Sequence, residues 1–141
     1  MRHFLPALLL GVVALFGASG SIARPVLLIS IDGLRPADVI DAQQRGLKLP
    51  NLQAFLTRGS YASDVRGVLP TLTYPAHTTL ITGVAPALHG ISNNLTFDPT
   101  NKNQLGWDWY ASDIRVPTLW DAAHAAGLTT ANVHWPVSVG A

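Results

Sequence analysis

The chain has 141 residues, a length that suits one domain, and carries 9 Lys and Arg against 8 Asp and Glu. This near-zero net charge gives no sign of a nucleic-acid-binding patch or of a basic membrane-surface patch. Because cysteine is absent, a disulfide framework and a thiolate metal site are excluded. A bound metal would therefore need Asp, Glu, His or hydroxyl ligands.

The first residues predict an export signal. A basic start, MRH, precedes the apolar run FLPALLLGVVALFGA, and small residues then offer cleavage after Gly20 or Ala23. A membrane anchor is the alternative, but the run is shorter than the roughly 20 residues of a spanning helix. We therefore predict a signal peptide over residues 1–23 and no stable membrane span. Export without cysteine favours a periplasmic or secreted bacterial protein.

The next part of the chain predicts a strand, two helices and a second strand. The apolar run RPVLLISIDG is typical of a strand buried on both faces, and it stops at Asp32 and Gly33. Helices are expected over residues 35–46 and 49–59, because each segment has proline near its start and glycine at its end. Residues 61–69 (YASDVRGVL) are expected to form the second strand.

The remaining part predicts a helix that begins near Pro75 and then a long connection over residues 91–116. This connection is rich in Asn, Asp, Thr and Trp and lacks periodicity; connections of this length are usually functional or disordered. A helix is expected over residues 116–127, because this segment has proline near its start and glycine at its end. A strand is expected over residues 128–135.

This order of elements predicts an α/β fold, a three-layer α/β/α sandwich around a mostly parallel sheet. The sequence stops at Ala141, shortly after a predicted strand, which would leave a sheet edge unpaired. We therefore expect residues 24–141 to be the N-terminal part of a longer domain. A complete small domain is the alternative.

Asp32 is the first candidate for chemistry. It follows the first predicted strand, and ligands in open α/β sheets bind at the carboxyl ends of the strands. A carboxylate there could hold a divalent metal. It could equally cap the helix that begins near Pro36, because Asp is favoured at helix starts. Its position alone leaves both interpretations open.

The stretch GVLPTLTYPAHTTLITG is the second candidate. Pro75 suits the first helical turn, which places Thr73 and Tyr74 at the helix start or just before it. Unpaired N–H groups at a helix start can bind phosphate, and Thr73 could attack if a base or metal lowered the pKa of its hydroxyl. Local pattern alone favours a plain N-cap. His77 could act as a general base, but we favour a packed or solvent-facing histidine.

Asn94 lies early in the long connection. It begins the sequence NLT, which matches a glycosylation sequon. Its amide could instead donate a hydrogen bond to a developing oxyanion. Residues 107–110 (WDWY) are expected either to line the site or to pack as a lid, and His89 is expected to be structural. No two histidines show metal-ligand spacing.

Three segments together carry a family resemblance. LLISIDGLRPADV is similar to a first metal-ligand strand, LPTLTYPAHTTLITGVAPALHGISNN to a nucleophile block, and PTLWDAAHAAGLTTANVHWP to the helix and strand that follow. In this order they resemble the nucleotide pyrophosphatase/phosphodiesterase (type I phosphodiesterase) family of the alkaline phosphatase superfamily. The resemblance spans about residues 26–136 and implies an alkaline phosphatase-like fold.

The resemblance implies roles for four residues. Asp32 matches a zinc-ligating aspartate, and Thr73 matches the nucleophilic threonine, which also contacts a metal. Asn94 matches the asparagine that binds the transferring phosphoryl oxygen, and Tyr74 matches an aromatic residue beside the substrate base or leaving group. The implied activity is hydrolysis of phosphodiester or pyrophosphate bonds in a small-molecule or nucleotide substrate, through a phospho-threonine intermediate and with two zinc ions. Oxygen ligands alone would fit Mg²⁺ or Mn²⁺ as well.

The sequence also departs from the family pattern. The other zinc ligands of the family, an Asp-x-x-x-His, an Asp-His pair and a later His, would follow residue 141, so we expect this chain alone to be inactive. Val137 and Val139 stand where some members carry Gly and Glu. Two alternatives remain, a superfamily relative acting on phosphonates, phosphomonoesters or lipid headgroups, and a non-catalytic exported binding module.

Overall fold

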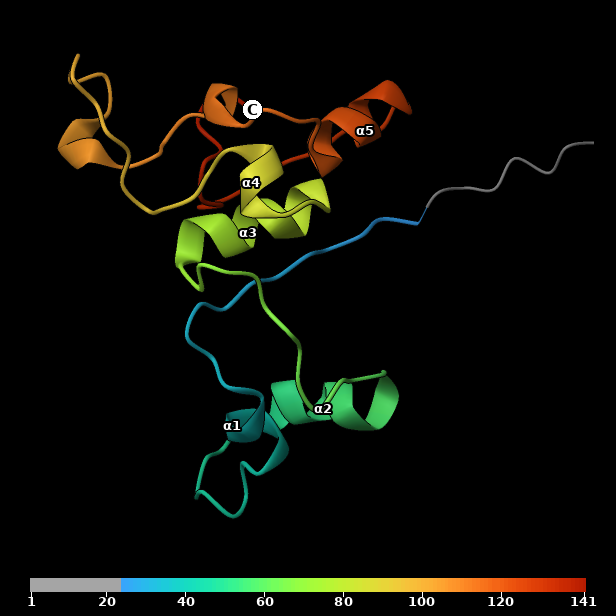
Figure 1. Ribbon diagram of the computed structural model, residues 1–141. Helices are drawn as coiled ribbons and strands as arrows, with labels where there is room; N and C mark the ends of the chain where they lie inside the picture. Colours follow the sequence, from blue (N-terminus) through green and yellow to red (C-terminus); the bar gives the residue numbers. More distant parts are fainter. Residues whose placement is uncertain (1–23) are drawn as a thin grey trace, which may run out of the picture. The chain divides into compact units, whose positions relative to one another are not determined.

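The computed structural model describes residues 24–141, so the predicted signal peptide, residues 1–23, lies outside the described residues. The chain divides into two units, Met1–Ser30 and Ile31–Ala141. The described part of the first unit has no regular secondary structure, and the second unit contains every described helix (Figure 1). None of these helices is long and apolar enough to cross a membrane.

Two of the predicted helices begin at the expected proline. α1 spans Pro36–Ile40 and α2 spans Pro50–Arg58, each with proline in its first turn. Gly59 follows α2 as predicted. α1 is shorter than predicted, since the chain continues from residue 41 as turns to Gly46, where φ is +69°. The two helices pack against each other.

The next two helices follow one another closely. α3 (Thr73–Thr82) ends at Gly83, whose φ of 70° is the left-handed conformation that glycine adopts without strain. α4 (Pro86–His89) ends at Gly90, where φ is 89°. A Cβ atom on Gly90 would lie 2.7 Å from Arg115 Nε, so glycine there also makes room for the arginine side chain. α3 packs against α4.

α5 (Leu119–Ala125) lies within the predicted 116–127 helix and packs against α3 (Figure 1). Its start is a capping box, in which the Thr118 N–H donates to Asp121 Oδ2 at 2.7 Å and the Asp121 N–H donates to Thr118 Oγ1 at 3.3 Å. The hydrogen bonds from Thr118 lower the pKa of Asp121. The helix therefore begins at a residue fixed by local sequence.

The three predicted strands are not formed in residues 24–141, which contain only the isolated bridges Leu95–Trp107 and Tyr110–Val139. An apolar strand makes no hydrogen bonds within itself, so it forms only where a neighbouring strand pairs with it. Val26 and Leu27, predicted to be buried in the first strand, are 91% and 83% exposed. The structure thus corrects the strand predictions, and the parallel sheet of the sandwich is not present in these residues.

A small apolar cluster lies beside α3. Tyr74, Ile91 and Val137 are buried together, and Trp107 and Ile114 pack against them. These residues come from the helix start, the long connection and the last segment of the chain. The cluster therefore holds the start of α3 against segments that are distant in sequence.

His89 is fully buried and joins α4 to α3. Its Nδ1 accepts a hydrogen bond from the Ile91 N–H at 3.2 Å, so Nε2 carries the ring hydrogen and donates it to Thr79 Oγ1 at 3.0 Å. Burial lowers the pKa of His89, which favours this neutral ring. These contacts give His89 the structural role expected from the sequence.

We expect the free energy of unfolding to fall as the pH drops from about 7 to about 5. The unfolded chain protonates its histidines near pH 6.5, whereas the lowered pKa of folded His89 resists protonation. The stability contributed by the neutral ring is therefore present above about pH 6.5 and is lost as the pH falls through this window. Urea denaturation at a series of pH values measures the slope.

The matched variants are His89→Gln, which should reduce this slope, and His124→Gln at an exposed position of α5, which should keep it. Burial raises the pKa of Asp108, so the protonation of Asp108 favours the folded state as the pH falls, opposite to the effect of His89. This effect on the slope is the same in both variants. The same slope in both variants would contradict the role assigned to His89.

Candidate active site

Thr73, the first residue of α3, contacts Asp32, which lies 41 positions earlier in the chain. Thr73 Oγ1 donates a hydrogen bond to Asp32 Oδ2 over 3.1 Å. Thr73 is half-buried and Asp32 is exposed, so the pair is open to solvent. The structure therefore brings together two candidate residues that the sequence places in separate segments.

Neither residue caps a helix, so the capping interpretation of each is wrong. The N-cap of α3 is Leu72, and that of α1 is Arg35; neither makes a side-chain capping hydrogen bond. Arg35 instead forms an ion pair with Asp38 at 2.9 Å. The polar groups of Thr73 and Asp32 are directed at each other rather than at a helix end.

Asn94 provides the hydrogen bond that a capping side chain would make at α3. Its Oδ1 accepts from the backbone N–H of Tyr74, the second residue of the helix, at 2.9 Å. Because Oδ1 is the acceptor here, the NH₂ group of Asn94 remains a donor beside the first turn. An amide held in this way is tied to α3, which argues against its use as a glycosylation site.

The backbone of Asn94 is fixed as well. Leu95 and Trp107 form an antiparallel bridge, and the Asp108 N–H donates to the Asn94 carbonyl oxygen at 3.2 Å. This pairing closes the intervening residues into a loop whose two ends meet at Asn94. The long connection thus places Asn94 at the helix start through both its main chain and its side chain.

Tyr74 lies beside these residues but is only 9% exposed. It packs against Trp107 with ring centroids 5.3 Å apart and planes tilted by 50°, and Trp109 lies 6.2 Å from Trp107. Burial, together with the nearby charge of Asp108, raises the pKa of the Tyr74 hydroxyl. Of the two interpretations of residues 107–110, the packed one describes Trp107.

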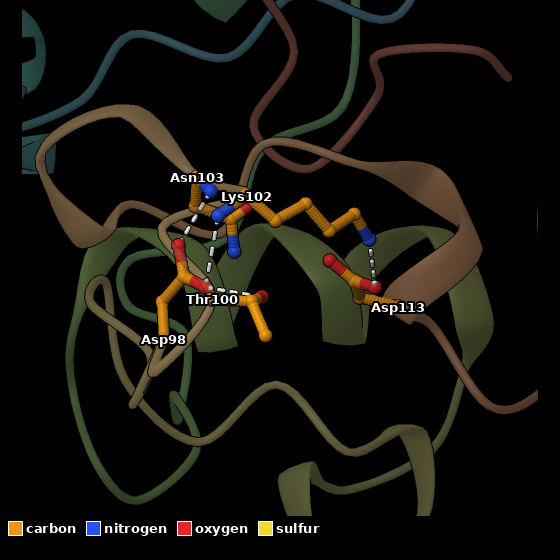
Figure 2. A network of polar contacts seen from close by, with 5 residues as sticks. All are labelled: Asp98, Thr100, Lys102, Asn103 and Asp113. Carbon is orange, nitrogen blue, oxygen red and sulfur yellow. Dashed lines mark hydrogen bonds and ion pairs between the residues drawn. The ribbon is translucent and has the colours of Figure 1, made fainter.

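A network of polar contacts holds the middle of the long connection (Figure 2). This connection is mostly irregular, as predicted, but contains two short 3₁₀ helices, η1 (Gln104–Gly106) and η2 (Ala111–Asp113). Asp98 accepts hydrogen bonds from Thr100 Oγ1 at 3.2 Å and from the backbone N–H groups of Lys102 and Asn103 at 3.0 and 2.5 Å. These bonds lower the pKa of Asp98. Lys102 Nζ also pairs with Asp113 at 3.1 Å, so specific contacts fix the loop that carries Asn94.

His77 contacts Thr73 through the main chain and not through the hydroxyl. Its Nδ1 lies 2.7 Å from the Thr73 carbonyl oxygen, and the residue is only 8% exposed. Of the packed or solvent-facing positions that the sequence favoured for His77, the structure shows the packed one. Sequence reasoning missed this hydrogen bond and the contact of Trp107 with Tyr74; the spacing of four residues between Thr73 and His77 was the one available signal.

Asp32 and Thr73 could hold a divalent metal ion through one carboxylate and one hydroxyl oxygen. Such ligands suit zinc, magnesium or manganese. Two ligands do not complete the four of a zinc site, however, and residues 24–141 contain no group of three or more Asp, Glu, His or Cys residues placed to hold an ion. The described residues fit part of the coordination shell of one metal ion.

Comparison with known proteins places this chain in a family. The family model described as type I phosphodiesterase / nucleotide pyrophosphatase matches residues 26–140, which include all four candidate site residues. The chain is 32% identical over 122 residues to ectonucleotide pyrophosphatase/phosphodiesterase family member 1 from Homo sapiens, covering 81% of this chain. It is 34% identical over 122 residues to family member 3 from Rattus norvegicus, again covering 81% of this chain.

Venom phosphodiesterase 2 from Crotalus adamanteus is 33% identical over 120 residues, which cover 81% of this chain. The chain spans only 12%, 13% and 14% of the length of these three relatives. The match of the family model over nearly all of residues 24–141 confirms the resemblance found in the sequence. The chain belongs to the type I phosphodiesterase / nucleotide pyrophosphatase family.

Proposed function

We propose that this chain carries the nucleophile segment of an exported, metal-dependent phosphodiesterase / nucleotide pyrophosphatase, with Thr73 as the nucleophile. The observation that carries the proposal is the 3.1 Å hydrogen bond from Thr73 Oγ1 to Asp32 Oδ2. A threonine hydroxyl attacks poorly unless a base or a metal favours its ionised form. A carboxylate that already accepts the hydroxyl hydrogen is placed either to remove it or to share a metal with the oxygen.

The proposed reaction has two steps. Thr73 Oγ forms a bond to phosphorus, and the bond from phosphorus to the leaving oxygen breaks. The hydroxyl hydrogen is lost toward Asp32 and is balanced by the proton that the leaving oxygen takes up. Water then attacks the phosphorus of phospho-threonine, releases the phosphoryl product and restores the hydroxyl. Zinc bound by Asp32 and Thr73 would lower the pKa of the Thr73 hydroxyl and offset negative charge. The proposal includes a second zinc ion, for which residues 24–141 supply no ligand group.

Asn94 and Tyr74 are assigned to the substrate side of the site. Asn94 keeps its NH₂ donor while Oδ1 is held by the Tyr74 N–H at 2.9 Å, so we assign this donor to a non-bridging phosphoryl oxygen. Charge grows on that oxygen in the transition state, where a fixed donor is most effective. Tyr74 is buried in the apolar cluster and only 9% exposed, so we assign it to the wall of the site beside a base or leaving group.

We further propose that the whole protein has the three-layer α/β/α sandwich and that a longer product supplies the missing strand partners and metal ligands. The relatives, of which the chain spans only 12% and 14% of the length, support this proposal. The coding sequence after Ala141 tests it. An open frame that encodes Asp-x-x-x-His and then Asp-His would support the enzyme, whereas an immediate stop codon would favour a non-catalytic binding module.

Export and a small-molecule substrate complete the proposal. The apolar start of the sequence predicts a signal peptide, and the names of two relatives contain "ecto" and "venom". A periplasmic or secreted protein would meet phosphodiesters and nucleotides in solution. Periplasmic fractionation of cells that express the natural gene, with a cytoplasmic enzyme as the marker, tests this location.

The activity is tested with a matched pair of substrates. The protein encoded by the complete gene should hydrolyse the nitrophenyl ester of a nucleotide, a phosphodiester, faster than nitrophenyl phosphate, a monoester. A chelator should abolish both activities, and zinc should restore them, because the proposed nucleophile needs a metal. Faster hydrolysis of the monoester or of a phosphonate would overturn the assignment and favour another member of the superfamily.

A further inference from the structure

Two side chains hold the first turn of α3, and neither belongs to its N-cap. Asn94 Oδ1 accepts from the Tyr74 N–H, and His77 Nδ1 lies 2.7 Å from the Thr73 carbonyl oxygen. A carbonyl oxygen only accepts hydrogen bonds, so Nδ1 carries the hydrogen and donates it. His77 therefore fixes the main chain of the same residue whose hydroxyl contacts Asp32.

The His77 ring is itself held in place. It lies edge-on to Trp135, with centroids 5.3 Å apart and planes at 76°. Trp135 in turn lies edge-on to Trp120 of α5, at 5.9 Å and 72°. Aromatic rings favour such edge-to-face contacts. This row of three rings connects α5 to the first turn of α3 and restricts the rotation of the imidazole.

The position of the Thr73 hydroxyl depends on this turn. Threonine is branched at Cβ and stiff at χ1, so its Oγ1 follows any shift of the backbone. Leu72, the N-cap of α3, makes no side-chain capping bond, and the Thr73 hydroxyl is directed to Asp32. The hydrogen bond from His77 therefore holds the main chain of Thr73 itself.

We propose that His77 is a positioning residue for Thr73, an inference that rests on the proposed function. It is not the base that takes the hydroxyl hydrogen. Its Nδ1 donates to the carbonyl oxygen, and the Thr73 hydroxyl donates to Asp32 Oδ2. His77 sets the line of attack and does not touch the substrate, so its loss should lower kcat and leave KM nearly unchanged.

Two substitutions separate the donor from the ring. His77→Phe keeps an aromatic ring against Trp135 but removes the donor, and we expect kcat to fall by about 10- to 100-fold, the effect of a displacement of about 1 Å. His77→Asn carries an amide nitrogen on Cγ, where Nδ1 stood, and should recover most of the loss. His124→Gln, at an exposed position of α5, is the control and should match the wild type.

The outcomes distinguish this inference from the proposed function. A wild-type protein without diesterase activity would contradict the function itself. If the wild type is active and His77→Phe is equally active, the positioning role alone is overturned. The same holds if His77→Asn folds but loses as much activity as His77→Phe. Nitrogen NMR of the imidazole is independent of turnover. A hydrogen on Nδ1 of His77 supports the inference, and one on Nε2 alone overturns it.

Discussion

Replacing Thr73 with alanine is expected to reduce the kcat for phosphodiester hydrolysis by at least about 10³-fold, because removal of a nucleophile leaves only binding and electrostatic contributions to catalysis. The substitution removes Oγ1 and with it the hydrogen bond to Asp32. It leaves the carboxylate of Asp32 in place, so bound metal should decrease little. The measurements are kcat with the nitrophenyl nucleotide ester and the zinc content after dialysis.

Thr73→Ser is the matched control, since serine keeps the hydroxyl and loses only a methyl group. We expect it to retain a measurable fraction of the activity. Acid quenching during turnover, followed by mass spectrometry, should find a phosphoryl group on the peptide that contains Thr73 in the wild type and none in the alanine variant. Full activity of Thr73→Ala would rule out the proposed mechanism.

Four of the α-helices, α1, α2, α3 and α5, could be predicted from the sequence because their ends follow local rules, whereas α4 (Pro86–His89) was not predicted. Pro50 and Gly59 bracket α2 as expected, and Gly83 ends α3 in the left-handed conformation. A helix also satisfies most of its own backbone hydrogen bonds, so it can form without distant partners. The predicted strands do not form in residues 24–141, because each needs a neighbouring strand that these residues do not provide.

The candidate site shows the same division between local and distant information. Motif similarity identified Asp32, Thr73 and Asn94 one at a time. The hydrogen bonds that bring them to the start of α3, however, connect residues that are 41 and 20 positions apart in the sequence. Local rules assigned Thr73 to a helix cap. Those rules consider the residues that flank a helix, whereas here Asn94 from the long connection satisfies the Tyr74 N–H. The hydroxyl of Thr73 is consequently left for Asp32.

Replacing Asp32 with asparagine is expected to lower both the bound metal and the activity, which distinguishes it from Thr73→Ala. Asparagine has the same shape and can still accept the hydrogen bond from Thr73 Oγ1, but it lacks the negative charge. Divalent metal ions bind carboxylate oxygen far better than an amide oxygen. We expect the affinity for zinc to fall by at least about 10²-fold, a larger loss than removing an outer-shell partner of a metal ligand causes.

The measurement is activity over a zinc titration, together with metal content at equilibrium. Asp32 is exposed, so the substitution should leave the core intact. The control is Asp38→Asn in α1, which removes the same charge from a carboxylate that pairs with Arg35. If excess zinc restores Asp32→Asn toward wild-type kcat, the carboxylate acts mainly by holding the metal. If activity stays low at saturating zinc, Asp32 also acts on the Thr73 hydroxyl. Unchanged zinc affinity and unchanged kcat would remove Asp32 from the site.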